Sequence, residues 1–274
     1  MADPAARKPA ASGVDVGSSL VKLAERGPDG RLALRIAPRS GLEALAADLD
    51  ARAPRLGLTG AGAPALARRL ATRAAVVDEF AAWRRGTARL LAEQGHALER
   101  YLLVSLGTGT SALLVEGPSA SRIGGTALGG GTVLGLGAGL TGVAEFGALA
   151  ALALEGDRRR VDLLVSEIGE VPLPGEATAS AFAKLALPGA EAARAADLAR
   201  AVMGLVGENV ALLCCALARA HGVHHIVYGG NTLRGNAALR DVLVGLTRLL
   251  GREPLLLRDG EFAGALGALE LAED

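Results

Sequence analysis

Two turns built from small residues each follow a short run of β-forming residues. The first is Gly17-Ser18-Ser19, after Val14-Asp15-Val16, and the second is Gly107-Thr108-Gly109-Thr110-Ser111. Glycine lets a backbone approach a ligand without a Cβ atom, its N–H groups can point at phosphate oxygens, and Ser and Thr hydroxyls add further donors. One such turn is common in β-rich domains, but two equivalent turns that face each other can enclose a polyphosphate. The pair therefore predicts a site for the phosphates of a nucleotide such as ATP.

Three charged side chains stand where they could act on a bound nucleotide. Asp15 precedes the first turn, where its carboxylate can hold Mg²⁺ through water, although a turn-capping Asp would have the same position. Lys22 follows on the next strand, and in a chain with so few lysines it suggests a phosphate contact; a solvated edge-strand Lys is the alternative. Glu79 opens a predicted helix, where it can act as general base on a substrate hydroxyl or simply complement the helix dipole.

The segment from Arg122 to Thr132 is the richest in glycine. So many glycines before a helix cost backbone entropy unless something must come close. The free N–H groups at the start of that helix predict that ATP phosphates rest on Gly129-Gly130-Gly131-Thr132. Arg122 can pair with a substrate carboxylate in bidentate fashion, or it can be a surface arginine on an edge strand.

A predicted strand near the C-terminus ends in Gly229-Gly230-Asn231. Such an ending suits an adenine or ribose ring that lies flat against bare backbone, although an ordinary glycine turn before a helix has the same pattern. The four histidines show no metal-ligand spacing with acidic or cysteine partners, and no nucleophile-elbow motif is present. The sequence therefore favours nucleotide binding over metallo- or serine hydrolysis.

Composition and charge exclude several other classes of function. Lys and Arg total 29, as do Asp and Glu, so the basic excess typical of nucleic-acid binding is missing. Cys214 and Cys215 are adjacent and offer neither a disulfide framework nor a metal-ligand set, which fits a reducing cytoplasm. The N-terminal residues have no signal-peptide core, and Glu208 and Asn209 interrupt the most apolar stretch. We expect a cytoplasmic protein without nucleic-acid or membrane partners.

The pattern of strands and helices occurs twice along the chain. Three predicted strands between residues 14 and 36 precede alternating helices and strands up to residue 94, and three further strands between 101 and 123 restart the pattern. Helices are then expected over most of 132–153 and 177–220. Two successive units of this kind imply two similar α/β lobes with a cleft between them.

The predicted division of the chain follows from that restart. Residues 1–12, rich in Ala and Pro, are expected to form a flexible tail. The N-terminal lobe is predicted over residues 13–98 and the C-terminal lobe over residues 99–274. No low-complexity linker separates the lobes, so lobe motion would have to come from hinge residues.

Four ordered motifs carry a resemblance to a known family. They are RIGGTALGGGT at 122–132, PGEATASAF at 174–182, GGNTLRGN at 229–236 and EFAGALGAL at 261–269. With them the chain resembles the type II pantothenate kinases of the acetate and sugar kinase, Hsc70 and actin superfamily, from about residue 13 to residue 269. The resemblance implies an α/β, two-lobed, actin-like ATPase fold (a duplicated ribonuclease H-like fold) with MgATP between its lobes.

The resemblance also implies roles for individual residues. Glu79 looks like the family's catalytic base, and Arg122 looks like the arginine that binds the carboxylate region of pantothenate. Thr108 and Ser111 match positions that contact the pantoyl-type ligand or an inhibitory acyl-CoA. The implied function is ATP-dependent phosphorylation of pantothenate to 4'-phosphopantothenate, the first step of coenzyme A biosynthesis, by a cytoplasmic homodimer.

The first turn departs from the family pattern. The family usually has Gly-Gly-Thr there, whereas this chain has Gly17-Ser18-Ser19, closer to the Gly-Ser-Thr of the related acyl-CoA dehydratase activator ATPases. Those activators hold an iron–sulfur cluster between subunits with cysteines, which the adjacent Cys214-Cys215 pair does not supply. Two alternatives stay open: a related small-alcohol or sugar kinase, and a catalytically degenerate sensor that binds CoA or nucleotide.

Overall fold

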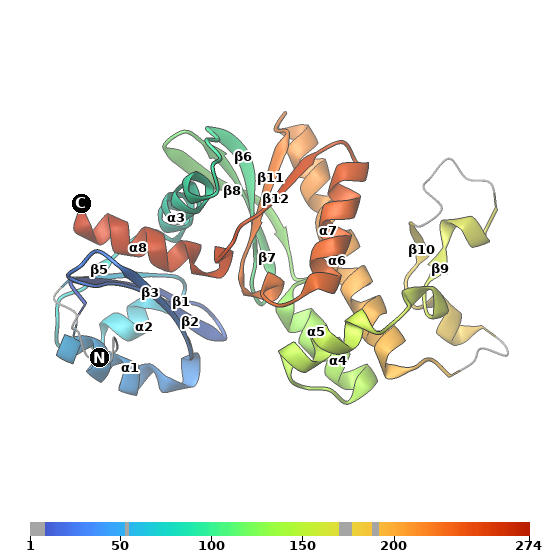
Figure 1. Ribbon diagram of the computed structural model, residues 1–274, viewed down its shortest axis with the longest axis horizontal. Coiled ribbons are helices and arrows are strands. Elements are labelled where there is room, and N and C mark those ends of the chain that lie inside the picture. Colours follow the sequence, from blue (N-terminus) through green and yellow to red (C-terminus); the bar gives the residue numbers. More distant parts are fainter. Residues whose placement is uncertain (1–8, 53–54, 170–176, 188–191) are drawn as a thin grey trace.

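The computed structural model, which describes residues 9–52, 55–169, 177–187 and 192–274, has two α/β lobes with one five-stranded sheet each (Figure 1). The sheet orders are β3-β2-β1-β4-β5 and β12-β11-β6-β7-β8. In each sheet a three-stranded antiparallel meander is extended by parallel strands beyond its first strand. The lobes therefore share one topology, and the predicted two-lobed α/β fold is confirmed.

The bounds of the regular elements follow the predicted order along the chain. The strands are β1 (Ala11–Val16), β2 (Leu20–Arg26), β3 (Leu32–Pro38), β4 (Leu56–Thr59), β5 (Ala75–Val76), β6 (Arg100–Leu106), β7 (Thr110–Glu116), β8 (Ser119–Thr126), β9 (Leu163–Leu164), β10 (Thr178–Ser180), β11 (His225–Gly229) and β12 (Glu253–Leu256). The α-helices are α1 (Leu42–Arg52), α2 (Ala63–Ala67), α3 (Glu79–Glu93), α4 (Gly130–Thr141), α5 (Phe146–Leu154), α6 (Ala195–Ala220), α7 (Ala237–Leu249) and α8 (Ala263–Glu273). Short 3-10 helices include η2 (Arg39–Gly41), η6 (Asn231–Leu233) and η7 (Gly260–Phe262).

The central strand of the second sheet, β6, is buried on both faces, and its side chains alternate between two apolar clusters. On β6, Tyr101 and Leu103 pack into the cluster formed with α3 and α8, while Leu102 and Val104 pack into the cluster formed with α6. All four side chains are fully or almost fully buried. The middle of this strand is a continuous run of apolar residues, as expected for a strand that has helices on both sides.

The last helix, α8, packs against the first sheet although it follows the second sheet in sequence (Figure 1). A Cβ atom on Gly13 of β1 would overlap the carbonyl of Ala265, and one on Gly57 of β4 would overlap the carbonyl of Ala268. Glycine at these two positions therefore lets the helix lie directly on the strands. We place α8 with the first lobe, so the lobes are not the two continuous segments 13–98 and 99–274.

Helix α3 lies against α8 equally closely. A Cβ atom on Gly86 would overlap the Ala263 carbonyl, and one on Gly267 would overlap the Ala82 carbonyl. The helix begins at Glu79, where the N-cap residue Asp78 accepts a hydrogen bond of 2.8 Å from the Ala81 N–H. The cap and the close helix pair together fix where the first turn of α3 points.

Strand β1 begins earlier than the predicted tail allows. Ala11 and Ser12 were expected in a flexible tail at 1–12, but Ala11 pairs with Arg26 of β2 and both residues are buried. The apolar Ala11 side chain joins the core beside α8, which accounts for its order. Of the predicted tail, residues 1–8 lie outside the described residues.

The prediction of helix over most of 177–220 is wrong in its first part. Thr178–Ser180 forms β10, which pairs antiparallel with β9, and Phe182 has a left-handed φ of 61° that a helix does not allow. Helix begins only at Ala195. Within the family motif at 174–182, the residues 174–176 lie outside the described part of the chain.

Helix α6 is the described helix that is, by itself, long and apolar enough to cross a membrane. In the structure 61% of its 18-residue apolar window is buried, against α4, α5, α7 and the second sheet. Glu208, which interrupts the apolar run, forms an ion pair of 2.6 Å with Arg158. The expected buried core helix is what the structure shows.

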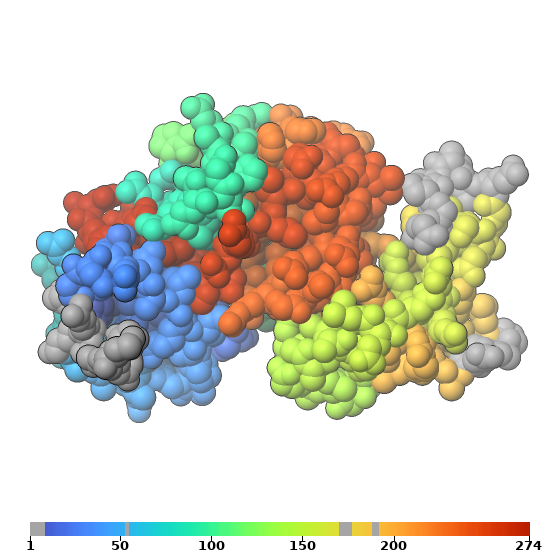
Figure 2. All heavy atoms as spheres, viewed as in Figure 1, coloured from blue at the N-terminus to red at the C-terminus, as the bar shows by residue number. Residues whose placement is uncertain are grey.

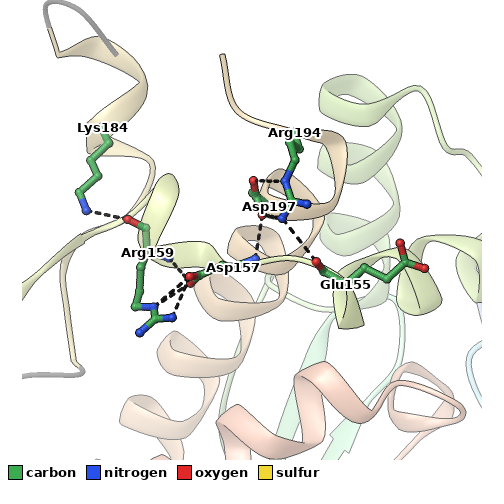
Figure 3. Close-up of polar contacts among 6 residues, drawn as sticks. All are labelled: Glu155, Asp157, Arg159, Lys184, Arg194 and Asp197. Atoms are coloured by element: carbon green, nitrogen blue, oxygen red, sulfur yellow. Dashed lines mark hydrogen bonds and ion pairs between the residues drawn. The ribbon is translucent and has the colours of Figure 1, made fainter. Parts of the chain in front are cut away.

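The segment that carries β9 and β10 extends away from the first lobe (Figure 1). Asp197 hydrogen-bonds residues at both ends of this segment. Its buried carboxylate accepts hydrogen bonds of 2.9 and 2.7 Å from Arg194 and one of 2.8 Å from the Asp157 N–H (Figure 3). Arg194 also donates to the Glu155 carbonyl at 3.5 Å. The Arg194 hydrogen bonds hold the pKa of Asp197 at about 2, below the ordinary 3.8.

We expect Asp197→Asn to lower the free energy of unfolding by about 1–3 kcal/mol, because a charge-assisted pair of hydrogen bonds is lost. Since the folded-state pKa lies below the unfolded one, this contribution is present above pH 3.8 and is lost as the pH falls to about 2. Urea unfolding at several pH values measures it. Asp241→Asn on the exposed face of α7 is the control. A difference that does not change between pH 6 and pH 2 would contradict the assignment.

Candidate active site

The two predicted turns lie in one cavity between the lobes. The cavity has a volume of about 620 Å³. On the face shown in Figure 2 the surface is indented between the first lobe, in blue, and the region of α4 and α5, in yellow-green, and residues of both parts line the cavity. The predicted site residues that line it are Asp15, Gly17, Ser18, Ser19, Lys22, Glu79, Gly107, Thr108, Gly109, Thr110, Ser111, Arg122, Gly130, Gly131 and Asn231.

The first and second turns touch each other through side-chain hydroxyls. Ser18 Oγ lies 2.7 Å and Ser19 Oγ 3.1 Å from Thr108 Oγ1. These contacts span some ninety residues of sequence and join the first lobe to the second. The two turns predicted from the sequence are therefore in direct contact, and the hydroxyl groups of Ser18, Ser19 and Thr108 lie together.

Glycines around the second turn serve backbone packing. The N–H groups of Gly130 and Gly131 donate to the carbonyls of Gly107 and Thr108, at 2.8 and 2.9 Å. A Cβ atom on Gly129 would stand 2.7 Å from the Thr108 carbonyl oxygen. The start of α4 therefore holds the turn, and these N–H groups are already engaged rather than free for phosphate as the sequence suggested.

Four predicted nucleotide-binding residues do not line the cavity: Gly129, Thr132, Gly229 and Gly230. Thr132 caps its own helix, because its hydroxyl accepts from the Gly129 N–H at 3.3 Å. Gly230 has φ 107°, and a Cβ atom there would overlap the Leu106 backbone. Gly230 is thus required by the close passage of the chain beside β6. Asn231, the next residue, does line the cavity.

Asp15 on β1 and Lys22 on β2 lie opposite each other on the two strands that the first turn connects. They are register partners, and Lys22 Nζ lies 3.7 Å from Asp15 Oδ2. A Cβ atom on Gly60 or Gly264 would come within 3 Å of the Asp15 carboxylate, so these small residues enclose it. Burial raises the pKa of Asp15, and the Lys22 charge opposes the rise.

Glu79 at the start of α3 is coupled to the same pair. Burial raises the pKa of Glu79 above its ordinary 4.5, the negative charges of Asp15 and Asp78 raise it further, and Lys22 lowers it. A carboxylate with a raised pKa is a stronger base than one in water, which suits proton removal from a hydroxyl. Glu79 is also the acidic residue in the first turn of α3, and it lines the cavity.

The site suits Mg²⁺ that is held mainly by phosphate oxygens. No group of three or more His, Cys, Asp or Glu side chains that could hold a metal occurs among the described residues. Mg²⁺ in nucleotide sites keeps several waters and uses one or two carboxylates. The enclosed carboxylate of Asp15 at the base of the phosphate-binding turn meets that requirement.

A bulge in β8 turns Arg122 toward the cavity. The β7–β8 register shifts so that Leu113 pairs with Arg122 while Ala112 pairs with Gly124, which leaves one extra residue on β8. Gly125 has φ 156°, and a Cβ atom there would lie 2.6 Å from an Arg122 guanidinium nitrogen. Gly125 therefore makes room for the arginine side chain.

Sequence reasoning missed the apolar wall of the cavity. Trp83, Leu134 and Phe146 line it, and none of the three is among the predicted site residues. Trp83 does pack in the core and is 8% exposed. Its spacing of four from Glu79 puts both on one helix face, and this signal was available in the sequence. Leu134 and Phe146 come together only through the bend between α4 and α5.

Comparison with known proteins identifies the family. The Fumble family model matches residues 64–270. A type II pantothenate kinase of Staphylococcus haemolyticus is 34% identical over 263 residues, which cover 94% of this chain and 98% of that protein. The chain belongs to the type II pantothenate kinase family. Family members from Staphylococcus epidermidis and Staphylococcus aureus are also 34% identical, over 94% and 95% of this chain and 99% of each of those proteins.

Solved structures of lower identity share the fold. The activator of the 2-hydroxyisocaproyl-CoA dehydratase from Clostridium difficile, with bound ADPNP, has a TM-score of 0.64 at 17% identity and covers 96% of this chain and 93% of its own. A glucokinase of the ROK family from Streptomyces griseus has a TM-score of 0.57 at 17% identity, over 96% of this chain and 99% of its own. The actin-like, two-lobed fold expected for the pantothenate kinase family is confirmed.

We expect Asp15→Asn to lower the pKa of Glu79, because the negative charge that raises it is removed while Lys22 remains. Carbon-detected NMR titration of glutamate carboxyls in the nucleotide-free protein measures this shift. Glu43→Gln, which removes an exposed first-turn carboxylate of α1, is the matched control and should leave the Glu79 titration unchanged. An unchanged Glu79 pKa in Asp15→Asn would show that the two carboxylates are not coupled.

Proposed function

We propose that the protein transfers the γ-phosphoryl group of ATP to the primary hydroxyl of pantothenate, giving 4'-phosphopantothenate and ADP. Full-length similarity to type II pantothenate kinases supports the assignment of substrate. The observation that carries the chemistry is the single cavity in which Glu79, Arg122 and both turns meet. This reaction is the first step of coenzyme A biosynthesis, and a cytoplasmic location and a homodimer are part of the proposal.

Glu79 is the proposed general base. Its carboxylate takes the proton of the substrate hydroxyl while that oxygen forms a bond to the γ-phosphorus. The bond between the γ-phosphorus and the β–γ bridging oxygen breaks, and ADP leaves with that oxygen. The raised pKa of Glu79 supports this role, because the base becomes stronger without a change of residue.

Arg122, Thr108 and Ser111 are the proposed contacts for the acceptor substrate. The guanidinium of Arg122 carries the positive charge that a pantothenate carboxylate requires. Thr108 and Ser111 offer hydroxyl groups at the second turn for the pantoyl hydroxyls. CoA or an acyl-CoA, which contains the same pantoyl unit, is the proposed competing ligand at these residues.

The nucleotide is proposed to lie along the first and second turns. The Gly17-Ser18-Ser19 and Gly107-Thr108-Gly109-Thr110 backbones and Lys22 would contact its phosphates, and Asn231 its far end. Asp15 would hold Mg²⁺ through water, and the ion would supply neutralisation of charge on the phosphate oxygens. Closure of the lobes around ATP would exclude water and limit hydrolysis.

A coupled ADP-release assay with purified protein tests the proposal. Pantothenate is expected to give ADP release, whereas simple sugars and an amino sugar are not, and pantetheine measures how far the carboxylate matters. ADP release with a sugar and none with pantothenate would favour the small-alcohol or sugar kinase. Binding of acetyl-CoA in a thermal shift assay without any turnover would favour a degenerate sensor.

We expect Glu79→Gln to lower kcat at least 100-fold, because general base catalysis contributes about that much or more. Affinity for MgATP should change little. In the wild type kcat should fall as the pH drops through the raised pKa of Glu79, since only the ionised carboxylate accepts a proton. Glu43→Gln, another first-turn glutamate, separates a helix-dipole effect from catalysis. Full activity of Glu79→Gln would show that another group is the base.

A further inference from the structure

Arg39 contacts the first turn at two points, from outside the cavity. Its guanidinium donates a hydrogen bond of 2.7 Å to the Gly17 carbonyl, and its backbone N–H donates one of 3.2 Å to the Ser19 carbonyl. It is the first residue of η2, directly after β3. Gly17, Ser18 and Ser19 line the cavity, but Arg39 does not. Arg39 therefore donates hydrogen bonds to the Gly17 and Ser19 carbonyls without lining the cavity itself.

The hydrogen bond from the Arg39 guanidinium to the Gly17 carbonyl constrains the direction of the Ser18 N–H. The Gly17–Ser18 peptide is trans, and in a trans peptide the C=O and the N–H point in opposite directions. Because the Gly17 C=O is held by a residue that does not line the cavity, the opposite Ser18 N–H is expected on the cavity side. The Gly17 N–H donates to the Leu20 carbonyl at 3.0 Å and closes the β1–β2 hairpin, so it is already engaged.

The charge of Arg39 adds to this geometry. Within the part of the chain that the structure describes, no carboxylate lies within 4 Å of its guanidinium nitrogens. Arg35, the nearest arginine before it on β3, is by contrast paired with Asp48 at 3.0 Å. A guanidinium that is not neutralised stands beside the turn and favours an anion on the turn's other side.

We propose that Arg39 is a positioning residue for the phosphate-binding turn: it holds the Gly17 and Ser19 carbonyls away from the cavity so that the Ser18 N–H faces the phosphates of ATP. The inference rests on the proposed use of ATP at this cavity. Without Arg39 the Gly17–Ser18 peptide can rotate, since glycine restricts it little, and a carbonyl oxygen would then face the phosphates. The effect is expected mainly on phosphate binding, because both hydrogen bonds of Arg39 go to this turn.

The test compares Arg39→Met, Arg39→Lys and the control Arg31→Met. Arg31 lies at the exposed β2–β3 hairpin, and its side chain is 89% exposed. The dissociation constant of a nonhydrolysable MgATP analogue is measured by calorimetry without pantothenate, and that of adenosine by competition. Melting temperature and the KM for pantothenate are measured on the same samples.

Arg39→Met is expected to raise the dissociation constant for the ATP analogue about tenfold, the usual effect of losing one charge-assisted hydrogen bond. Adenosine affinity should change less than about twofold, since adenosine carries no phosphate. The KM for pantothenate should change less than the constant for the analogue, since Arg39 acts on the acceptor site only through the contact of Ser18 and Ser19 with Thr108. Arg39→Lys keeps one charged donor and should limit the rise to about threefold. Arg31→Met should match the wild type.

Two results would overturn the inference: unchanged affinity for the ATP analogue in a folded Arg39→Met, or equal losses for the analogue, adenosine and pantothenate. If Arg39→Met does not fold, Arg39→Lys decides, because a raised constant for the analogue with unchanged adenosine affinity supports the role and an unchanged constant refutes it. Failure of the proposed function would look different, since the wild type would then bind the analogue but release no ADP with pantothenate.

Discussion

The arrangement of the cavity depends on one packing constraint, the direct contact of α8 with the first sheet and with α3. Gly13 of β1 and Gly86 of α3 allow this contact, because a Cβ atom at either position would overlap a carbonyl of α8. On α8 itself, Gly264 lies against the carboxylate of Asp15. One helix thus sets the end of β1 and the direction of α3 together, and with them the separation of Asp15 from Glu79. Because these contacts are between backbone atoms, side-chain rearrangements can change the position of α8 very little.

The charged groups of the cleft come from both lobes and act on one another. Asp15, Lys22 and Glu79 belong to the first lobe. Burial raises the pKa values of Asp15 and Glu79, the Asp15 charge raises that of Glu79 further, and the Lys22 charge opposes both rises. Arg122 comes from the second lobe, on the far side of the meeting turns. The proposed base from one lobe and the proposed cationic substrate contact from the other line the same cavity. This division supports the proposed phosphoryl transfer between two bound molecules, and it agrees with the family membership.

Glycine has two physical roles in this chain, and sequence reasoning separates them poorly. Gly17 leaves a turn open to the cavity, whereas Gly129 and Gly230 allow two backbones to pass each other. Both uses produce the same sequence signal, a glycine beside a turn or before a helix. Only the position where an added Cβ atom would fall distinguishes them. The glycine-rich segment at 122–132 therefore contributes Arg122, Gly130 and Gly131 to the cavity lining, whereas Gly129 and Thr132 do not line it.

The sequence by itself determined the duplicated strand pattern, the two turns and the candidate residues Glu79 and Arg122, because periodicity and residue type are local properties. Four ordered motifs, hard to obtain from composition bias, also determined the family. The tertiary structure decided what depends on distant segments: the return of α8 to the first lobe, the cavity wall at Phe146, and the hold of Arg39 on the first turn. It also replaced the helix expected before Ala195, where pairing of β10 with β9 outweighs the helix propensity of an alanine-rich segment. Contacts between residues far apart in the chain leave no local pattern, so they become visible only once the chain is folded.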